Sequence, residues 1–148
     1  MTLPKLDNDR FTTEAGYLVT TQTPEVCVEV IMKAVVACHD LKYGDYDQVA
    51  FRTSPGVQQF RSLPGGRNAP TEEAVTIPCV ELSFFLPANE TVLTSVLKAI
   101  YDAHPYEEPV IFVKESLRTL HISGLDEDNP NRYWNWEEDP WSPEQNRG

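Results

Sequence analysis

The residues best suited to chemistry lie in one short stretch, Ala103–Pro109, with the sequence Ala-His-Pro-Tyr-Glu-Glu-Pro. It places the imidazole of His104, the phenol of Tyr106 and the carboxylates of Glu107 and Glu108 within five residues. Such groups perform acid–base chemistry when burial raises the pKa of one carboxylate. Because adjacent strand residues point to opposite faces, we expect at most one glutamate to face a given pocket. The favoured alternative is a tight turn fixed by the two prolines, with charges that protect a sheet edge.

Two histidines form a candidate site for a divalent metal. His39 and His104 each end a predicted helix, and we expect both helices to run the same way, which would bring the histidines to one end of the sheet. Imidazole is a common ligand of zinc and copper. Packed helices lie about 8–10 Å apart, however, so one ion would need help from a loop, and His121 is near only if the tail folds back. Ordinary polar roles at helix ends are the favoured alternative.

A second candidate binding segment is the loop that begins at Pro64. Gly65 and Gly66 allow backbone amides to approach an anion, and Arg67 adds a cation. The segment lacks the spacing of a phosphate loop and has no helix after it. Small-anion or nucleotide binding is therefore one interpretation, and a solvent-exposed loop or a contact between subunits is the other.

Composition excludes several classes of partner. The chain of 148 residues has 23 acidic and 12 basic side chains and a net charge of -11 at pH 7, which would repel a nucleic acid. The longest apolar runs, Val28–Cys38 and Val80–Leu86, are far shorter than the roughly 20 residues that cross a bilayer. The first residues have no secretory apolar core, so we expect a cytoplasmic protein with no membrane partner.

The three cysteines are odd in number and widely spaced. Cys27, Cys38 and Cys79 form no Cys-x-x-Cys motif, and two of them lie on an apolar helical stripe. We therefore expect buried, reduced thiols, and neither disulfides nor a thiolate zinc site.

Hydrophobic periodicity and turn residues predict six elements, with the paired segments Tyr46–Thr53 and Val57–Leu63 counted as one. The expected strands are Gly16–Thr21, Tyr46–Thr53 paired with Val57–Leu63, Val75–Leu86 and Pro109–Lys114. The first helix has Thr23 as N-cap and a stripe from Val26 to Cys38. The second follows Asn89 and has a stripe from Val92 to Ile100.

The order β-α-β-β-α-β predicts an α+β protein of the ferredoxin-like class, a βαββαβ sandwich with both helices on one face of an antiparallel sheet. The other face needs cover, so we expect self-association. The expected division is an N-terminal segment of residues 1–14, a ferredoxin-like domain of residues 15–116 and a C-terminal acidic, Trp-rich extension of residues 117–148.

The C-terminal extension has its own pattern. Leu117–Ile122 is a candidate short strand, and Tyr133, Trp134, Trp136 and Trp141 then lie among acids and prolines. Large aromatic side chains are usually buried against a surface. We expect them to dock on the sheet or on a neighbouring subunit; a linear recognition segment for another protein is the alternative.

Ala103–Pro109, together with Gly44–Phe51 and Gly56–Gly65, resembles a signature of the YqfO-type domain of NIF-three-like (Ngg-interacting factor) proteins. The resemblance implies a fold similar to the CutA and PII signalling proteins, which are trimers. In PII-like proteins, a long ligand-responsive loop occupies the place of residues 64–68. Full-length NIF-three-like proteins carry a two-metal site in flanking domains, for which we expect no room in this chain.

These observations favour a non-enzymatic PII/CutA-like binding or regulatory module, assembled as a homotrimer. It would bind a small ligand or ion in clefts between subunits, or a protein partner. One alternative is metal tolerance through metal binding, by analogy with CutA. Another is a small hydrolase or cyclohydrolase-like enzyme that uses His104, Tyr106 and a neighbouring glutamate.

Overall fold

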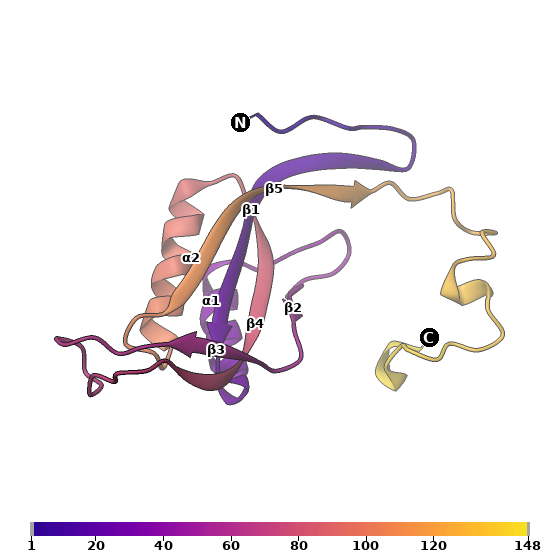
Figure 1. Cartoon of the computed structure of the whole chain (residues 1–148). Helices are drawn as coiled ribbons and strands as arrows, with labels where there is room; N and C mark the ends of the chain where they lie inside the picture. The colour runs from indigo at the N-terminus through magenta and orange to yellow at the C-terminus, as the bar shows by residue number, and fades with distance from the viewer. Residues whose placement is uncertain (1, 148) are drawn as a thin grey trace.

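The computed structural model describes residues 2–147 and contains one antiparallel sheet with two helices packed against it (Figure 1). The strand order is β2 (Phe51–Arg52), β4 (Val75–Pro87), β1 (Phe11–Thr23) and β5 (Val110–His121), and β3 (Gly56–Phe60) pairs with a further part of β4. The core is formed where the helices meet the sheet. The predicted ferredoxin-like α+β class is confirmed.

Two long strands form the centre of the sheet. β1 (Phe11–Thr23) and β4 (Val75–Pro87) run antiparallel, with Gly16 opposite Pro87 and Thr23 opposite Val80. β5 (Val110–His121) pairs along the other edge of β1 over its whole length. β-Branched and aromatic residues dominate the paired segments, as expected for pleated, half-buried strands.

Along each strand, successive side chains point to opposite faces of the sheet. Val19 of β1 and Val80, Leu82, Phe84 and Leu86 of β4 are buried against the helices. Each such side chain contributes roughly 1.5–3 kcal/mol by leaving water.

The helices α1 (Val28–Cys38) and α2 (Glu90–Ala103) supply the other half of the core. Ile31, Val35, Val96 and Ile100 are fully buried between helices and sheet. The predicted cap of α2 is confirmed, because the side chain of Asn89 accepts a hydrogen bond from the Val92 amide at 3.1 Å.

The helices run in opposite directions, so the prediction that they run the same way is wrong. Each helix runs antiparallel to the strand that precedes it in the chain. Those two strands, β1 and β4, are themselves antiparallel neighbours. The ends of α1 and α2 therefore lie at opposite ends of the sheet.

The predicted start of the first helix is also wrong. Residues Glu25–Cys27 form a 3₁₀ turn, and the hydroxyl of Thr23 donates to the Pro24 carbonyl at 3.2 Å without capping a helix. A 3₁₀ turn has three residues per turn, which shifts the phase of the helix that follows. The buried stripe accordingly begins at Val28, while Val26 is 88% exposed.

The expected hairpin of Tyr46–Thr53 with Val57–Leu63 does not form. β2 is only Phe51–Arg52, and both it and β3 (Gly56–Phe60) pair with β4. The loop before β2 contains left-handed backbone at three positions: Leu41, Gly44 and Gln48. Left-handed residues cannot continue a strand, which limits β2 to two residues.

Two predicted boundaries fall inside strands. β1 begins at Phe11, so part of the segment of residues 1–14 belongs to the sheet. β5 continues to His121, so the expected separate strand at Leu117–Ile122 is its second half, and a division after residue 116 cuts it.

All three cysteines are free, but only Cys79 is buried as predicted. Cys27 is half-buried and Cys38 is exposed, since Cys38 ends α1 outside the buried stripe. Among residues 2–147, no helix combines the length and the hydropathy needed to cross a membrane.

The face of the sheet opposite the helices is partly covered. Arg118 of β5 lies over the rings of Tyr43 and Phe85, at 4.7 and 4.2 Å from their centroids, and pairs with Glu14 at 2.9 Å. Its guanidinium also donates to the carbonyl of Lys42. The loop between α1 and β2 is thereby held over one end of this face.

The rest of that face is open. Phe112, Thr20, Ser83 and Phe51 lie opposite one another across four strands, pointing away from the helices because Val19 points toward them. The two central hydroxyls are 2.9 Å apart, while Phe112 is 51% and Phe51 is 69% exposed. We call the surface formed by this row of four side chains the open face.

Candidate functional site

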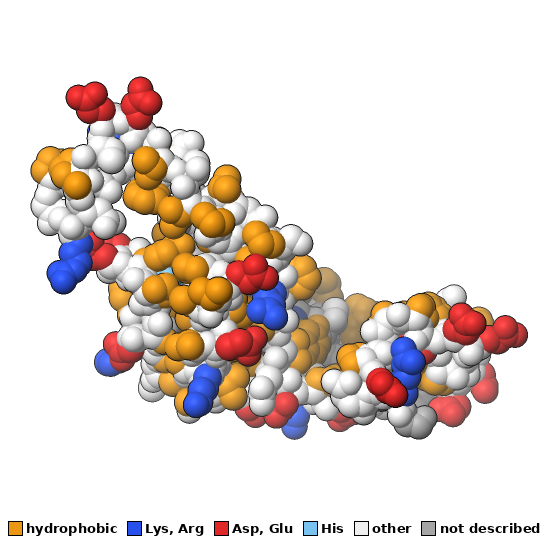
Figure 2. All heavy atoms as spheres, turned by 90° about the horizontal axis from the view of Figure 1, so that it is seen from below, with side chains coloured by type: hydrophobic (Ala, Val, Ile, Leu, Met, Phe, Trp, Pro, Cys, Tyr) orange, Lys and Arg blue, Asp and Glu red, His pale blue; other side chains and the backbone are white. Residues whose placement is uncertain are grey.

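A solvent-open cleft of about 1050 Å³ lies where the loop between β3 and β4 approaches the turn between α2 and β5. Figure 2 views the molecule from below and shows a band of hydrophobic side chains with charged groups at its margins. The cleft is lined from four sources, namely β1, β3 with its following loop, the start of β4, and the residues around the start of β5.

Six of the seven residues predicted to bind a ligand line this cleft: Gly65, Gly66, Arg67, Tyr106, Glu107 and Glu108. The two stretches that the sequence singled out separately are thus neighbours in the fold. The seventh, His104, is buried and does not line the cleft.

Glu107 joins the two halves of the cleft. Its carboxylate accepts the backbone N–H of Arg67 at 3.1 and 3.2 Å, and a Cβ added to Gly66 would lie 3.7 Å from the same carboxylate. The predicted ability of this loop to bring an amide to an anion is therefore used within the chain, with Glu107 as the anion. An external anion at this amide would have to displace Glu107.

Glu108 lines the cleft beside Glu107, and the strand alternation that predicted only one glutamate facing a pocket does not operate at this turn. The alternation rule applies to strands, and β5 begins only at Val110. Both glutamates belong to the turn before it, where side chains need not alternate.

His104 holds the turn in place from inside the protein. Its Nδ1 accepts the backbone N–H of Tyr106 at 3.1 Å, so the proton is on Nε2, which donates to the carbonyl of Gln22 at 2.7 Å. Burial lowers the pKa of this imidazole, while the contact with Gln22 opposes the shift. His104 is therefore a neutral structural group with both nitrogens occupied, and it is not a free base.

Tyr106 points its hydroxyl inward. The ring lies 4.7 Å from that of His104, and the buried hydroxyl has no hydrogen-bond partner among the described residues. Burial, followed by the proximity of the Cys79 and Cys27 thiols, raises the pKa of the phenol. The ring therefore shapes the cleft, while its hydroxyl is directed away from a ligand.

The cleft contains polar groups that sequence reasoning missed. The amides of Gln22 in β1 and Gln58 in β3 meet at 2.8 Å, and the guanidinium of Arg61 lies at the start of the loop. Phe60 and Phe112 add aromatic surface. Only the pairing of strands brings these residues to the site, and no spacing in the sequence indicates it.

The predicted metal pair His39 and His104 is not assembled. His104 contacts Gln22 near the end of β1, whereas His39 lies beside the loop held at Arg118, opposite Glu14 near the start of β1. The eight residue steps from Glu14 to Gln22 span roughly 26 Å at the usual strand rise. Residues 2–147 contain no group of three or more His, Cys, Asp or Glu side chains suited to a metal.

Comparison with known proteins rests on structure, because no protein-family model and no curated protein matches the sequence. A Bacillus cereus protein related to NIF3 is 25% identical with a TM-score of 0.59, over 70% of this chain and 26% of that one. CutA from Xylella fastidiosa is 17% identical with a TM-score of 0.50, over 68% of this chain and 82% of that one. CutA from Synechococcus elongatus is 17% identical with a TM-score of 0.50, over 78% and 85%.

The chain thus spans about a quarter of the NIF3-related protein and most of the CutA proteins. The predicted resemblance is confirmed: the chain is similar to part of a NIF3-related protein and has the fold of CutA.

Proposed function

We propose that the protein is a homo-oligomeric binding module that holds a small polar ligand in the cleft between the β3–β4 loop and the α2–β5 turn. The observation that carries the proposal is the convergence of the two predicted binding stretches on one cleft of about 1050 Å³. This volume is at the upper end of the range for small-molecule sites.

The lining defines the chemistry of the ligand. The amides of Gln22 and Gln58 can donate and accept, Arg61 and Arg67 supply cations, and the ring of Phe60 supplies a flat apolar surface. Glu107 and Glu108 add negative charge to the same lining, with Glu107 next to Arg67. This mixture suits a small molecule that carries both an anionic group and hydrogen-bond donors.

The oligomeric part of the proposal rests on the open face. Phe112 and Phe51 are exposed at the two ends of a row that crosses the sheet. Apolar side chains on an uncovered sheet face are usually buried by association. We take a trimer as the assembly, in line with the CutA-like fold, and a cytoplasmic location, in line with three free cysteines.

The ligand is tested by thermal unfolding in the presence of ATP, ADP, inorganic phosphate, glutamate and divalent cations, each added alone. We expect at least one to raise the melting temperature, because binding to the native state alone stabilises it. The double variant Arg61→Ala/Arg67→Ala should lose that rise. The matched control Lys33→Ala/Lys98→Ala, which removes two exposed helix cations, should keep it. A rise that survives in the Arg61/Arg67 variant, or the absence of any rise, would contradict the proposal.

A further inference from the structure

The C-terminal tail, residues 122–147, lies away from the helices at the end of a two-stranded ribbon (Figure 1). Pairing of β1 with β4 begins only at Gly16, so residues 11–15 of β1 pair only with residues 117–121 of β5. Five residues extend this ribbon about 16 Å beyond the main sheet. We call the ribbon and the tail together the arm.

Such a ribbon is not self-sufficient. A two-stranded antiparallel pair without a third strand or a covering helix is at best marginally stable in water. Its exposed positions include Thr12 and His121, and no helix of residues 2–147 covers it in Figure 1. Its described contacts outside the pair come from loops: Tyr43 meets Thr119 at 3.4 Å, and the Leu6 amide donates to Thr13 at 3.0 Å. The ribbon is therefore supported by loop contacts near Arg118 and Thr13, and it lacks the helix packing that stabilises the rest of the fold.

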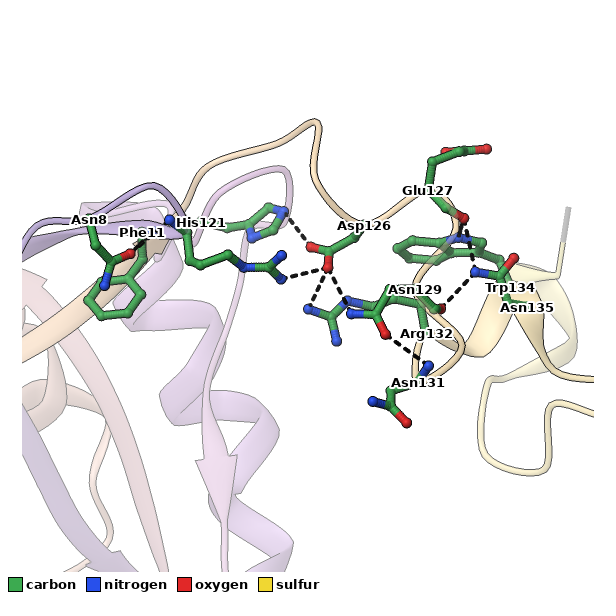
Figure 3. A network of polar contacts seen from close by, with 11 residues as sticks. Asn8, Phe11, His121, Asp126, Glu127, Asn129, Asn131, Arg132, Trp134 and Asn135 are labelled. Atoms are coloured by element: carbon green, nitrogen blue, oxygen red, sulfur yellow. Dashed lines mark hydrogen bonds and ion pairs between the residues drawn. The ribbon is translucent and has the colours of Figure 1, made fainter.

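The tail is nevertheless fixed to the ribbon by a buried carboxylate (Figure 3). Asp126 is 5% exposed and pairs with Arg10 at 2.5 Å and Arg132 at 3.1 Å, while Asn129 donates to it at 3.0 Å. His121 faces its other oxygen at 3.9 Å. The hydrogen bond from Arg10 is the largest of the effects that lower the pKa of Asp126 to about 2, so the carboxylate is ionised at neutral pH.

We call the contacts of Asp126 with Arg10, Arg132 and Asn129 the clamp. C-terminal to it, four aromatic side chains pack on one another. Tyr133 lies edge-on to Trp134 and Trp141, at 5.3 and 6.0 Å between centroids, and Trp136 lies 4.8 Å from Trp141. The indole N–H groups of Trp134 and Trp136 donate to the carbonyls of Glu127 and Pro130. The tail thus holds its rings in a set arrangement, and two of the three indoles have their polar atom already paired.

The rings are only half covered, with exposed fractions of 41 to 55%. Of the two surfaces expected to receive them, the chain's own sheet does not, and a neighbouring subunit stays a prediction. At about 150–250 Å² for each aromatic side chain, the four rings leave roughly 300–500 Å² of surface in water. A stable protein interface buries about 800 Å² on each partner, so this cluster is too small to hold a partner alone.

We propose that the arm docks on a second copy of this chain, as an auxiliary contact in an oligomer that is held mainly by the open face. An aromatic cluster of this area contributes to binding only where a larger interface already holds the partner. A second copy of the chain would provide that interface through the open face. The clamp at Asp126 lies beyond His121, and the cleft lies near Val110 at the other end of β5, so the arm stays away from its own cleft. This inference rests on the proposed oligomer.

The native chain supplies its own probe, because all three of its tryptophans, Trp134, Trp136 and Trp141, lie in the tail. Light scattering and tryptophan fluorescence with acrylamide quenching are measured on the same samples over a wide range of protein concentration. Rings half exposed in the single chain become fully covered in the core of an interface, so we expect assembly to lower the quenching constant by about twofold or more and to shift the emission to shorter wavelength.

Each of the three other possible outcomes would refute a specific part of the proposal. An oligomer whose indoles remain as accessible as in the single chain refutes the arm and leaves the proposed assembly intact. A monomer at every concentration with accessible indoles refutes the assembly and the arm together. A monomer with shielded indoles shows docking within one chain and refutes the arm.

Discussion

The substitution Tyr106→Phe, which removes only the hydroxyl group, tests the orientation of this side chain. Its hydroxyl is buried without a hydrogen-bond partner among the described residues, and an unpaired buried hydroxyl costs about 1–3 kcal/mol. Tyr106→Phe keeps the ring that packs beside His104 and removes the unpaired group. We therefore expect the variant to be more stable than the wild type, by about 1 kcal/mol at the lower end of that range.

Urea denaturation followed by circular dichroism measures this change. The matched control is Tyr101→Phe, which alters a 57% exposed side chain of α2 and should change the free energy of unfolding by less than about 0.5 kcal/mol. In thermal unfolding, a gain of 1 kcal/mol in a chain of this length raises the melting temperature by about 2–4 °C.

The raised pKa of Tyr106 adds a second readout. Because the folded state favours the neutral phenol, the stabilisation is present below the ordinary pKa of 10.0 and is lost as the pH rises through the folded value. The Phe variant should lack this alkaline loss. A variant that is less stable than the wild type by 1 kcal/mol or more would show that the hydroxyl has a partner and that its assigned orientation is wrong.

Three further changes test other parts of the structure. Gly16→Ala should destabilise the fold by about 1–3 kcal/mol or more in urea denaturation, because its Cβ would overlap the backbone of β4, whereas Gly56→Ala enters open space and should be near neutral. The lowered pKa of His104 means that the folded state favours the neutral imidazole, so its stabilisation is present above pH 6.5 and is lost as the pH falls from there toward the folded value. His104→Phe should remove this acid dependence, as measured by denaturation between pH 4 and pH 8, and an unchanged profile would contradict the assignment. Arg10→Ala should loosen the tail and speed its proteolysis, whereas Lys5→Ala, which removes an exposed surface pair, should not; equal cleavage rates would argue against the clamp.

Hydrophobic patterns correctly predicted those helices and strands in which one apolar pattern continues over the full length of the element. The stripe from Val92 to Ile100 with its cap at Asn89 corresponds to α2, and the apolar run at Val75–Leu86 corresponds to β4. These segments agree with the structure because burial of one face dominates their energetics.

Errors arose at local backbone irregularities that the hydrophobic pattern does not reveal, and where the pairing of strands decides the geometry. The 3₁₀ turn at Glu25–Cys27 shifted the buried stripe of α1, and positive φ angles at Leu41 and Gln48 shortened β2. The opposite directions of the helices follow from the antiparallel pairing of β1 with β4, which the predicted βαββαβ order already implies.

The candidate site was predictable in part. The turn at Tyr106–Glu108 and the loop at Gly65–Arg67 were both identified from their residues, but their proximity depends on β3 pairing with β4. Gln22 and Gln58 could not be identified, because each is an unremarkable strand residue until the strands are paired.

The central claim, an oligomer assembled through the open face, is tested most directly by light scattering on the full chain. The chain has a mass of 16.8 kDa, and we expect the mass of three chains, reduced toward one chain by Phe51→Lys at the exposed end of the row. The mass of a single chain at every concentration, or an assembly unaffected by Phe51→Lys, would contradict the account.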